Sequence, residues 1–147
     1  MGFLRRLFGE PTPPPEIDHP LFGRIRYSRP DGWQNRAFVL WGQGDVELLL
    51  DAGPLGPTTR QEDEFVRFRD AGDALLARCL AAVDEARRGM AVSPGEFRIS
   101  GLTIPSFETG PQPRLWTLWF DLEGDDHFMY GVQSDDEWRT LAAFADD

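Results

Sequence analysis

Residues 114–132 read RLWTLWFDLEGDDHFMYGV, and this stretch decides the predicted fold. Apolar residues recur at every second position on both sides of a Gly-Asp-Asp turn, which predicts two antiparallel strands. Directly opposed residues share one face of a sheet, so the odd connection at residues 124–126 is needed to bring both apolar sets together. That register pairs Phe120 with Tyr130 and places Trp119 on the opposite face. The hairpin therefore predicts one buried face and one outward-facing tryptophan.

The elements before this hairpin follow from similar patterns. Alternating residues and turn signals predict a three-stranded antiparallel meander within residues 24–50. The Thr-Arg-Gln-Glu capping box at residues 59–62 predicts a helix with Thr59 as its N-cap, and an apolar stripe continues it to about Arg88. Gly72 interrupts this stripe, and we interpret it as a site of close packing on the sheet rather than as a kink. A change of parity at Ser100-Gly101 predicts a β-bulge in the next strand.

A second capping box begins the last predicted element. The Ser-Asp-Asp-Glu run at residues 134–137 precedes Trp138, Leu141 and Phe144, whose spacing predicts a short C-terminal helix. The predicted fold class is therefore α+β: a mostly antiparallel sheet packed on one long central helix, with a short C-terminal helix and the element order βββ-α-βββ-α.

Residues 1–20 are predicted to lie outside the folded domain. Met1–Gly9 is amphipathic, with Arg5 and Arg6 on the side opposite its apolar residues. The next segment, Glu10–Pro20, holds five prolines and predicts a stiff spacer. A single α+β domain is then expected over residues 21–147.

The charged residues exclude several classes of protein. All 15 basic residues are arginine, and the absence of lysine rules out Schiff-base enzymes and the Walker A phosphate loop, which need an ε-amine. The formal net charge of −10 argues against nucleic acid as a partner and favours a basic one. No apolar run is long enough to cross a bilayer, so we expect a cytoplasmic protein without an integral membrane segment.

Histidine and cysteine offer little catalytic chemistry in this chain. His19 falls in the predicted spacer and His127 next to a turn, while Cys79 lies on the apolar stripe of the helix, where an unreactive buried thiol is expected. The Gly-x-Ser-x-Gly motif of a nucleophile elbow does not occur. We therefore expect no catalytic residue, no cofactor and no metal site.

Acidic residues gather close to aromatic ones in the last third of the chain. Residues 121–137 contain seven acids and no arginine. Next to an outward-facing tryptophan, this pattern predicts a surface that binds a basic protein. The alternative is that these acids only favour a turn and a helix N-terminus. The predicted partner-binding residues are Trp119, Asp121, Glu123, Asp125, Asp126, Asp135 and Asp136.

Several short motifs, spread over most of residues 21–140, resemble small acidic bacterial domains of unknown function. The motifs are Leu21-Phe22-Gly23-Arg24-Ile25, Trp33, Asp45-Val46-Glu47-Leu48, Gln61, Leu118-Trp119-Phe120-Asp121 and Trp138. Some of these domains occur in toxin–immunity settings, so the resemblance implies an immunity-type, non-enzymatic binding role and assigns no functional residue. Two other functions stay open. One is a small hydrolase-type enzyme whose carboxylates converge only in the fold, and the other is a homodimeric subunit.

Overall fold

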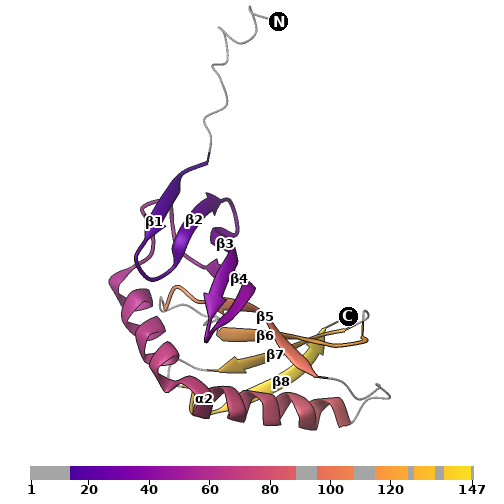
Figure 1. The fold of residues 1–147 in the computed structure, drawn as a ribbon. Coiled ribbons are helices and arrows are strands. Elements are labelled where there is room, and N and C mark those ends of the chain that lie inside the picture. The colour runs from indigo at the N-terminus through magenta and orange to yellow at the C-terminus, as the bar shows by residue number, and fades with distance from the viewer. Residues whose placement is uncertain (1–13, 89–95, 108–114, 126–127, 135–137, 147) are drawn as a thin grey trace, which may run out of the picture.

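The structure is a computed structural model, and it describes residues 14–88, 96–107, 115–125, 128–134 and 138–146. These residues form one eight-stranded sheet and one long helix (Figure 1). Helix α2 (Thr59–Arg88) lies between the fourth and fifth strands in the chain. The strands are β1 (Glu16–His19), β2 (Gly23–Ser28), β3 (Gly32–Leu40), β4 (Gln43–Leu50), β5 (Phe97–Ile104), β6 (Trp116–Leu122), β7 (Met129–Ser134) and β8 (Leu141–Asp146).

The strands follow one another across the sheet in the same order as in the chain. Every neighbouring pair is antiparallel except β4 and β5, which run parallel. Parallel neighbours need a crossover connection, because the chain has to return to the same end of the sheet, and α2 is that connection. The result is a mixed sheet in which two antiparallel meanders, β1–β4 and β5–β8, are joined by one parallel pair.

The predicted fold class is wrong at the C-terminal end of the chain. The segment expected to form a short helix is strand β8, which pairs antiparallel with β7 over its whole length. The spacing of Trp138, Leu141 and Phe144 suits a helix, but the free edge of β7 offers backbone hydrogen bonds to an extended chain, and this tertiary context overrides the local pattern. The element order is therefore ββββ-α-ββββ, with a single helix among the described residues.

A strand also occupies part of the segment predicted to be a spacer. Strand β1 pairs with β2, from Glu16 opposite Arg26 to His19 opposite Gly23. The backbone N–H of Tyr27 donates to the Pro15 carbonyl at 2.9 Å, so the sheet contacts begin directly after the prolines. Proline is tolerated here because β1 is an edge strand.

The hairpin register is confirmed. Phe120 lies opposite Tyr130, and Trp119 lies opposite Gly131. The β-bulge is also found where it was predicted, with the register of β5 against β6 shifting between Ile99 and Gly101.

The long helix is confirmed, but its N-cap is Thr58 rather than Thr59. The Thr58 hydroxyl accepts a hydrogen bond from the Gln61 backbone N–H at 3.2 Å, and the Gln61 side chain accepts one from the Thr58 N–H at 3.0 Å. The Gln61 amide is buried and also donates to the carbonyls of Asp51 and Pro105, each at 3.0 Å. One glutamine therefore ties the start of α2 to the ends of β4 and β5.

Gly72 forms a kink, so our interpretation of close packing is wrong. Its φ of 53° and ψ of −134° are not helical, and a Cβ added there would meet no atom within 4 Å. The kink lets α2 bend around the sheet, from the level of β3 and β4 to β8 (Figure 1).

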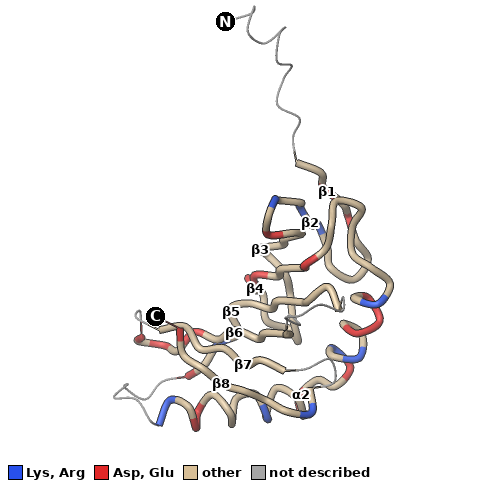
Figure 2. Tube along the Cα trace, turned by 180° about the vertical axis from the view of Figure 1, so that it is seen from behind, with Lys and Arg blue, Asp and Glu red and all other residues tan. Residues whose placement is uncertain are grey.

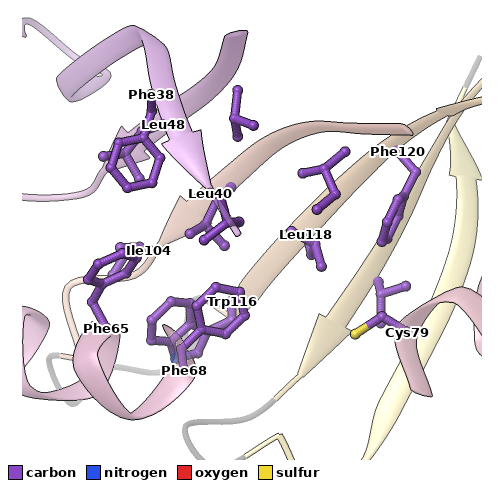
Figure 3. Close-up of a cluster of buried hydrophobic side chains, with 14 of the residues drawn as sticks. Phe38, Leu40, Leu48, Phe65, Phe68, Cys79, Ile104, Trp116, Leu118 and Phe120 are labelled. Atoms are coloured by element: carbon purple, nitrogen blue, oxygen red, sulfur yellow. The ribbon is translucent and has the colours of Figure 1, made fainter. Parts of the chain in front are cut away.

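The core lies between α2 and one face of the sheet, which we call the inner face. Phe68 of α2 packs against Trp116 and Trp138, with ring centroids 5.2 and 5.1 Å apart. Figure 3 shows Phe65 and Phe68 pointing from the helix toward the strands. Cys79 is fully buried in the same layer, and burial raises the pKa of its thiol to about 11. The thiol is therefore protonated at neutral pH, as an unreactive core cysteine should be.

Candidate functional site

The face of the sheet that points away from α2, here called the outer face, carries an unusual row of residues. Successive side chains of a strand point to opposite faces, so the residues between the core positions form this face. One row of directly paired residues crosses it on neighbouring strands: Glu47 of β4, Gly101 of β5, Trp119 of β6, Gly131 of β7 and Phe144 of β8. Glycines thus alternate with large side chains.

The two glycines leave space that the aromatic rings fill. A Cβ on Gly131 would lie 2.4 Å from Cζ of Phe144, so the Phe144 ring lies directly over the Gly131 backbone. A Cβ on Gly101 would lie 3.4 Å from Cδ1 of Trp119, so the indole leans over Gly101. The two rings meet edge to face, with centroids 5.4 Å apart and planes at 84°. The indole N–H of Trp119 donates to the Thr103 hydroxyl at 3.4 Å, which fixes the ring further.

The next row adds an exposed apolar residue between two acids. Met129 of β7 lies opposite Asp121 of β6 on one side and opposite Asp146 of β8 on the other, and Arg98 of β5 continues the row opposite Asp121. Met129 is 46% exposed, and both carboxylates are exposed. We call the set formed by both rows the outer patch. It consists of Glu47, Trp119, Asp121, Met129, Phe144 and Asp146.

A hollow of about 840 Å³ lies beside Trp119, above strand β5. Gly101, Glu47 and Trp119 are among its lining residues. Its charged lining consists of Arg36, Asp45, Glu47, Arg98 and Asp121. Figure 2 shows acidic positions on β4 and near the end of β8. Arg98 donates to the Gly44 carbonyl at 3.5 Å, so one of the two cations is directed toward the β3–β4 turn.

Ionic contacts on the described surface also occur away from the outer patch. The Glu16 carboxylate forms ion pairs with Arg24 at 2.9 Å and with Arg26 at 2.6 Å. The hydrogen bond from Arg26, and to a smaller extent that from Arg24, lowers the pKa of Glu16. His19 Nε2 lies 2.8 Å from Glu62 Oε1. Its Nδ1 accepts the backbone N–H groups of residues 21 and 22. His19 therefore joins the β1–β2 turn to the first turn of α2, which is a structural role.

The structure separates the predicted partner-binding residues into three groups. Trp119 and Asp121 belong to the outer patch. Glu123 is exposed in the β6–β7 turn. Asp125 is part of that turn: its carboxylate accepts hydrogen bonds from the Phe128 N–H at 3.3 Å and the Tyr130 hydroxyl at 3.2 Å, as the turn alternative expects. Three further predicted residues lie outside the described ranges, and they are Asp126, Asp135 and Asp136.

Four members of the outer patch were missed from the sequence. Phe144 was assigned to a helix, and Asp146 lay in the same segment, so neither could be placed beside Trp119. The predicted hairpin register already places Met129 on the outer face with Trp119 and Asp121, but Met129 is not among the predicted binding residues; Glu47 becomes a neighbour of Trp119 only through the pairing of β4, β5 and β6. One signal was available: a glycine inside a strand pattern, such as Gly131, marks a place where another group approaches the backbone closely.

Comparison of the chain with protein families, with curated proteins and with solved structures found no match. In the part of the chain that the structure describes, α2 lacks the combination of length and apolar character that a membrane-spanning helix requires. The same residues contain no group of three or more His, Cys, Asp or Glu side chains placed to hold a metal ion.

Proposed function

We propose that this protein is a non-enzymatic binding domain of the immunity type that recognises a basic partner protein through the outer patch. The observation that carries the proposal is the aromatic pair Trp119–Phe144, seated over glycines and bordered by carboxylates on an open sheet face. Exposed apolar groups with a charged rim are typical of protein-binding surfaces.

The chemistry of the patch suits a cationic side chain. An arginine of the partner can place its planar guanidinium over the Trp119 indole and at the same time bind a neighbouring carboxylate. Glu47 and Asp121 are suitable neighbours, because neither makes an ion pair within the described residues and both line the hollow next to the indole. Met129 and Phe144 offer apolar contact to the residues that flank such a cation.

The two arginines of the hollow restrict where a cation fits. Arg98 lies directly opposite Asp121 on the neighbouring strand, and Arg36 lines the same hollow, so both arginines repel an incoming cation while Glu47 and Asp121 attract it. Specific interfaces commonly combine an attractive and a repulsive element in this way. We therefore expect a partner segment whose positive charge is local rather than a uniformly basic surface.

The proposal is tested with a partner that wild-type protein captures and that is then purified for rate measurements. Replacing both Glu47→Gln and Asp121→Asn should slow association and reduce its dependence on salt, because charges steer the encounter. Trp119→Ala should speed dissociation by about 30-fold, the equivalent of about 2 kcal/mol for a hot-spot aromatic. Asp63→Asn, an exposed change on α2, is the matched control and should leave both rates unchanged. Unaltered rates in the patch variants contradict the proposal.

A further inference from the structure

We propose that a second copy of this chain packs face to face on the outer face, about a two-fold axis that runs along the strands between β5 and β6. The inference goes beyond the proposed function, because it needs no foreign partner. Two large apolar side chains exposed on the described surface, Val39 at 60% and Met129 at 46%, belong to this face. Val39 stands on β3 between the buried Phe38 and Leu40 and therefore points outward. Exposed apolar groups on an uncovered sheet face indicate contact with another molecule.

The charges of the outer face favour a copy of the same face over a uniformly basic surface. Arg36 and Glu47 line the hollow, and so do Arg98 and Asp121, which lie directly opposite each other on β5 and β6. Arg98 donates to the Gly44 carbonyl, a neutral group, so its charge is free to bind a carboxylate of another molecule. Positive and negative groups thus stand side by side. A face of this kind can be complementary to itself, as a two-fold symmetric dimer requires.

The strand register determines which residues meet in this dimer. A two-fold axis parallel to the strands reverses the strand order and keeps each position along the strands, so β5 faces β6 of the second copy. Residues that are paired across β5 and β6 within one chain therefore also face each other between the copies. Arg98 then faces Asp121 of the second copy, and Gly101 faces its Trp119. We infer this axis because it sets opposite charges against each other and a large side chain against a glycine.

The shape of the face suits this arrangement. Sheets that pack face to face lie about 10 Å apart, so large side chains of one sheet have to meet small ones of the other. The hollow above β5, about 840 Å³ in volume, includes Gly101 in its lining and receives the Trp119 indole of the second copy. The twist of packed sheets separates strands that lie far from the axis. The contacts of Arg98 and Gly101 lie next to the axis and are kept.

The dimer has a consequence for the binding of a foreign partner. Trp119 is covered in the dimer, so a basic partner binds the monomer and its binding separates the two copies. The apparent affinity for the partner should then fall as the concentration of the chain rises, because a smaller fraction of the molecules offers a free patch.

The decisive experiment mixes two charge variants. In the dimer, Arg98→Asp sets acid against acid and Asp121→Arg sets arginine against arginine. Each variant alone should therefore self-associate at least about 10-fold more weakly than the wild type. An equal mixture of the two should recover the dimer, because every contact between positions 98 and 121 of the two copies then joins opposite charges. The neighbours within each chain are the same in the mixture as in the separate samples, so recovery reports the contact between copies alone.

Sedimentation velocity at physiological salt measures the monomer–dimer equilibrium of each sample. Asp63→Arg, an exposed change on α2, is the matched control and should dimerise like the wild type. Positions 98 and 121 are both exposed, so the variants should stay folded, which circular dichroism checks. A wild-type chain that is monomeric at every soluble concentration overturns the proposal. A mixture that remains monomeric while the wild type dimerises also overturns it.

A second measurement needs no charge variant. In wild-type protein with ¹⁵N-labelled tryptophan, the Trp119 indole signal, assigned by Trp119→Phe, should shift as the protein concentration rises. The internal control is Trp41, whose indole N–H donates to the Arg69 carbonyl on the helix side at 3.0 Å, and its signal should stay in place. A shift of Trp41 with an unmoved Trp119 would assign the contact to the helix side and overturn the proposal.

The two proposals fail separately. If the variants and their mixture all stay monomeric like the wild type while Trp119→Ala still releases the purified partner, only the pairing of copies is wrong. If the mixture recovers the dimer while the partner ignores every patch variant, the proposed function is wrong and the outer face serves self-association alone.

Discussion

Trp116 and Trp119 lie three residues apart on β6 and have opposite environments. Trp116 is fully buried on the inner face, where its ring contacts Phe68 at 5.2 Å and Trp138 at 5.7 Å between centroids. Trp119 is only partly buried on the outer face, where its ring packs against that of Phe144 with centroids 5.4 Å apart. Three positions along a strand reverse the direction of a side chain, whereas three positions along a helix keep it on one side.

The comparison shows how one strand can serve stability and recognition separately. The inner face is closed by α2, so large side chains there meet other large side chains. No described helix or strand covers the outer face, and Gly101 and Gly131 supply the space that keeps two aromatic rings ordered there. A tryptophan can therefore be held in place without being buried.

The largest expected effect separates the two tryptophans by stability. Trp116→Ala should lower the free energy of unfolding by about 3–5 kcal/mol, because it leaves a cavity in the core. Trp119→Ala should lower it by only about 0.5–1.5 kcal/mol, the value of one aromatic pair. Urea unfolding measures both. Trp116→Phe is the control. The indole nitrogen of Trp116 has no hydrogen-bond partner among the described residues, so removing its N–H should lower the free energy of unfolding only slightly. Equal losses for the two alanine variants would show that the outer face is part of the core.

A second experiment tests how tightly the outer face is packed. Gly131→Ala should cost about 1–3 kcal/mol, because its Cβ would overlap the Phe144 ring. Gly44→Ala is the matched control, since a Cβ there meets nothing within 4 Å. Much of the cost should disappear when Gly131→Ala is combined with Phe144→Ala, and a double-mutant cycle measures this coupling. Additive losses would mean that Phe144 does not lie over Gly131.

A third experiment compares the access of solvent to the two faces. Cys79 should react slowly with thiol reagents in the native protein, whereas Met129→Cys should react fast because position 129 is exposed.

Burial raises the pKa of Cys79 from 9.0 to about 11. The unfolded thiol therefore ionises first, and native stability should fall as pH rises through this interval. Cys79→Ala should remove that part of the pH dependence, and rapid labelling of Cys79 would contradict the burial of the inner face.

The smallest expected effect concerns the exposed ion pairs at the edge of the outer face. Arg26 and Arg24 lower the pKa of Glu16 in the native protein. The ion pairs therefore stabilise the native state above the pKa that Glu16 has in the unfolded chain, and this stabilisation is lost as pH falls through its native pKa. Glu16→Gln should slightly lower the melting temperature at neutral pH and leave it unchanged in strong acid. A loss of the same size at both pH values would rule out the ion pairs as its cause.

The sequence by itself determined the features that depend on local periodicity. The register of the β6–β7 hairpin, the bulge before Gly101, the extent of α2 and the burial of Cys79 all follow from the spacing of apolar residues along one or two neighbouring elements. Parity in a strand and the 3.6-residue repeat of a helix act over short distances. Such features can therefore be predicted without knowing which distant segment packs against them.

Only the tertiary structure decided the C-terminal strand, the kink at Gly72 and the composition of the outer patch. Phe144 fits a helix or a strand equally well by its spacing, and the free edge of β7 selects the strand. The parallel pairing of β4 with β5, made possible by the α2 crossover, then brings Glu47 level with Trp119. Pairing between strands far apart in sequence depends on the whole sheet, because each strand's neighbour is fixed by hydrogen bonds and packing that no single segment contains.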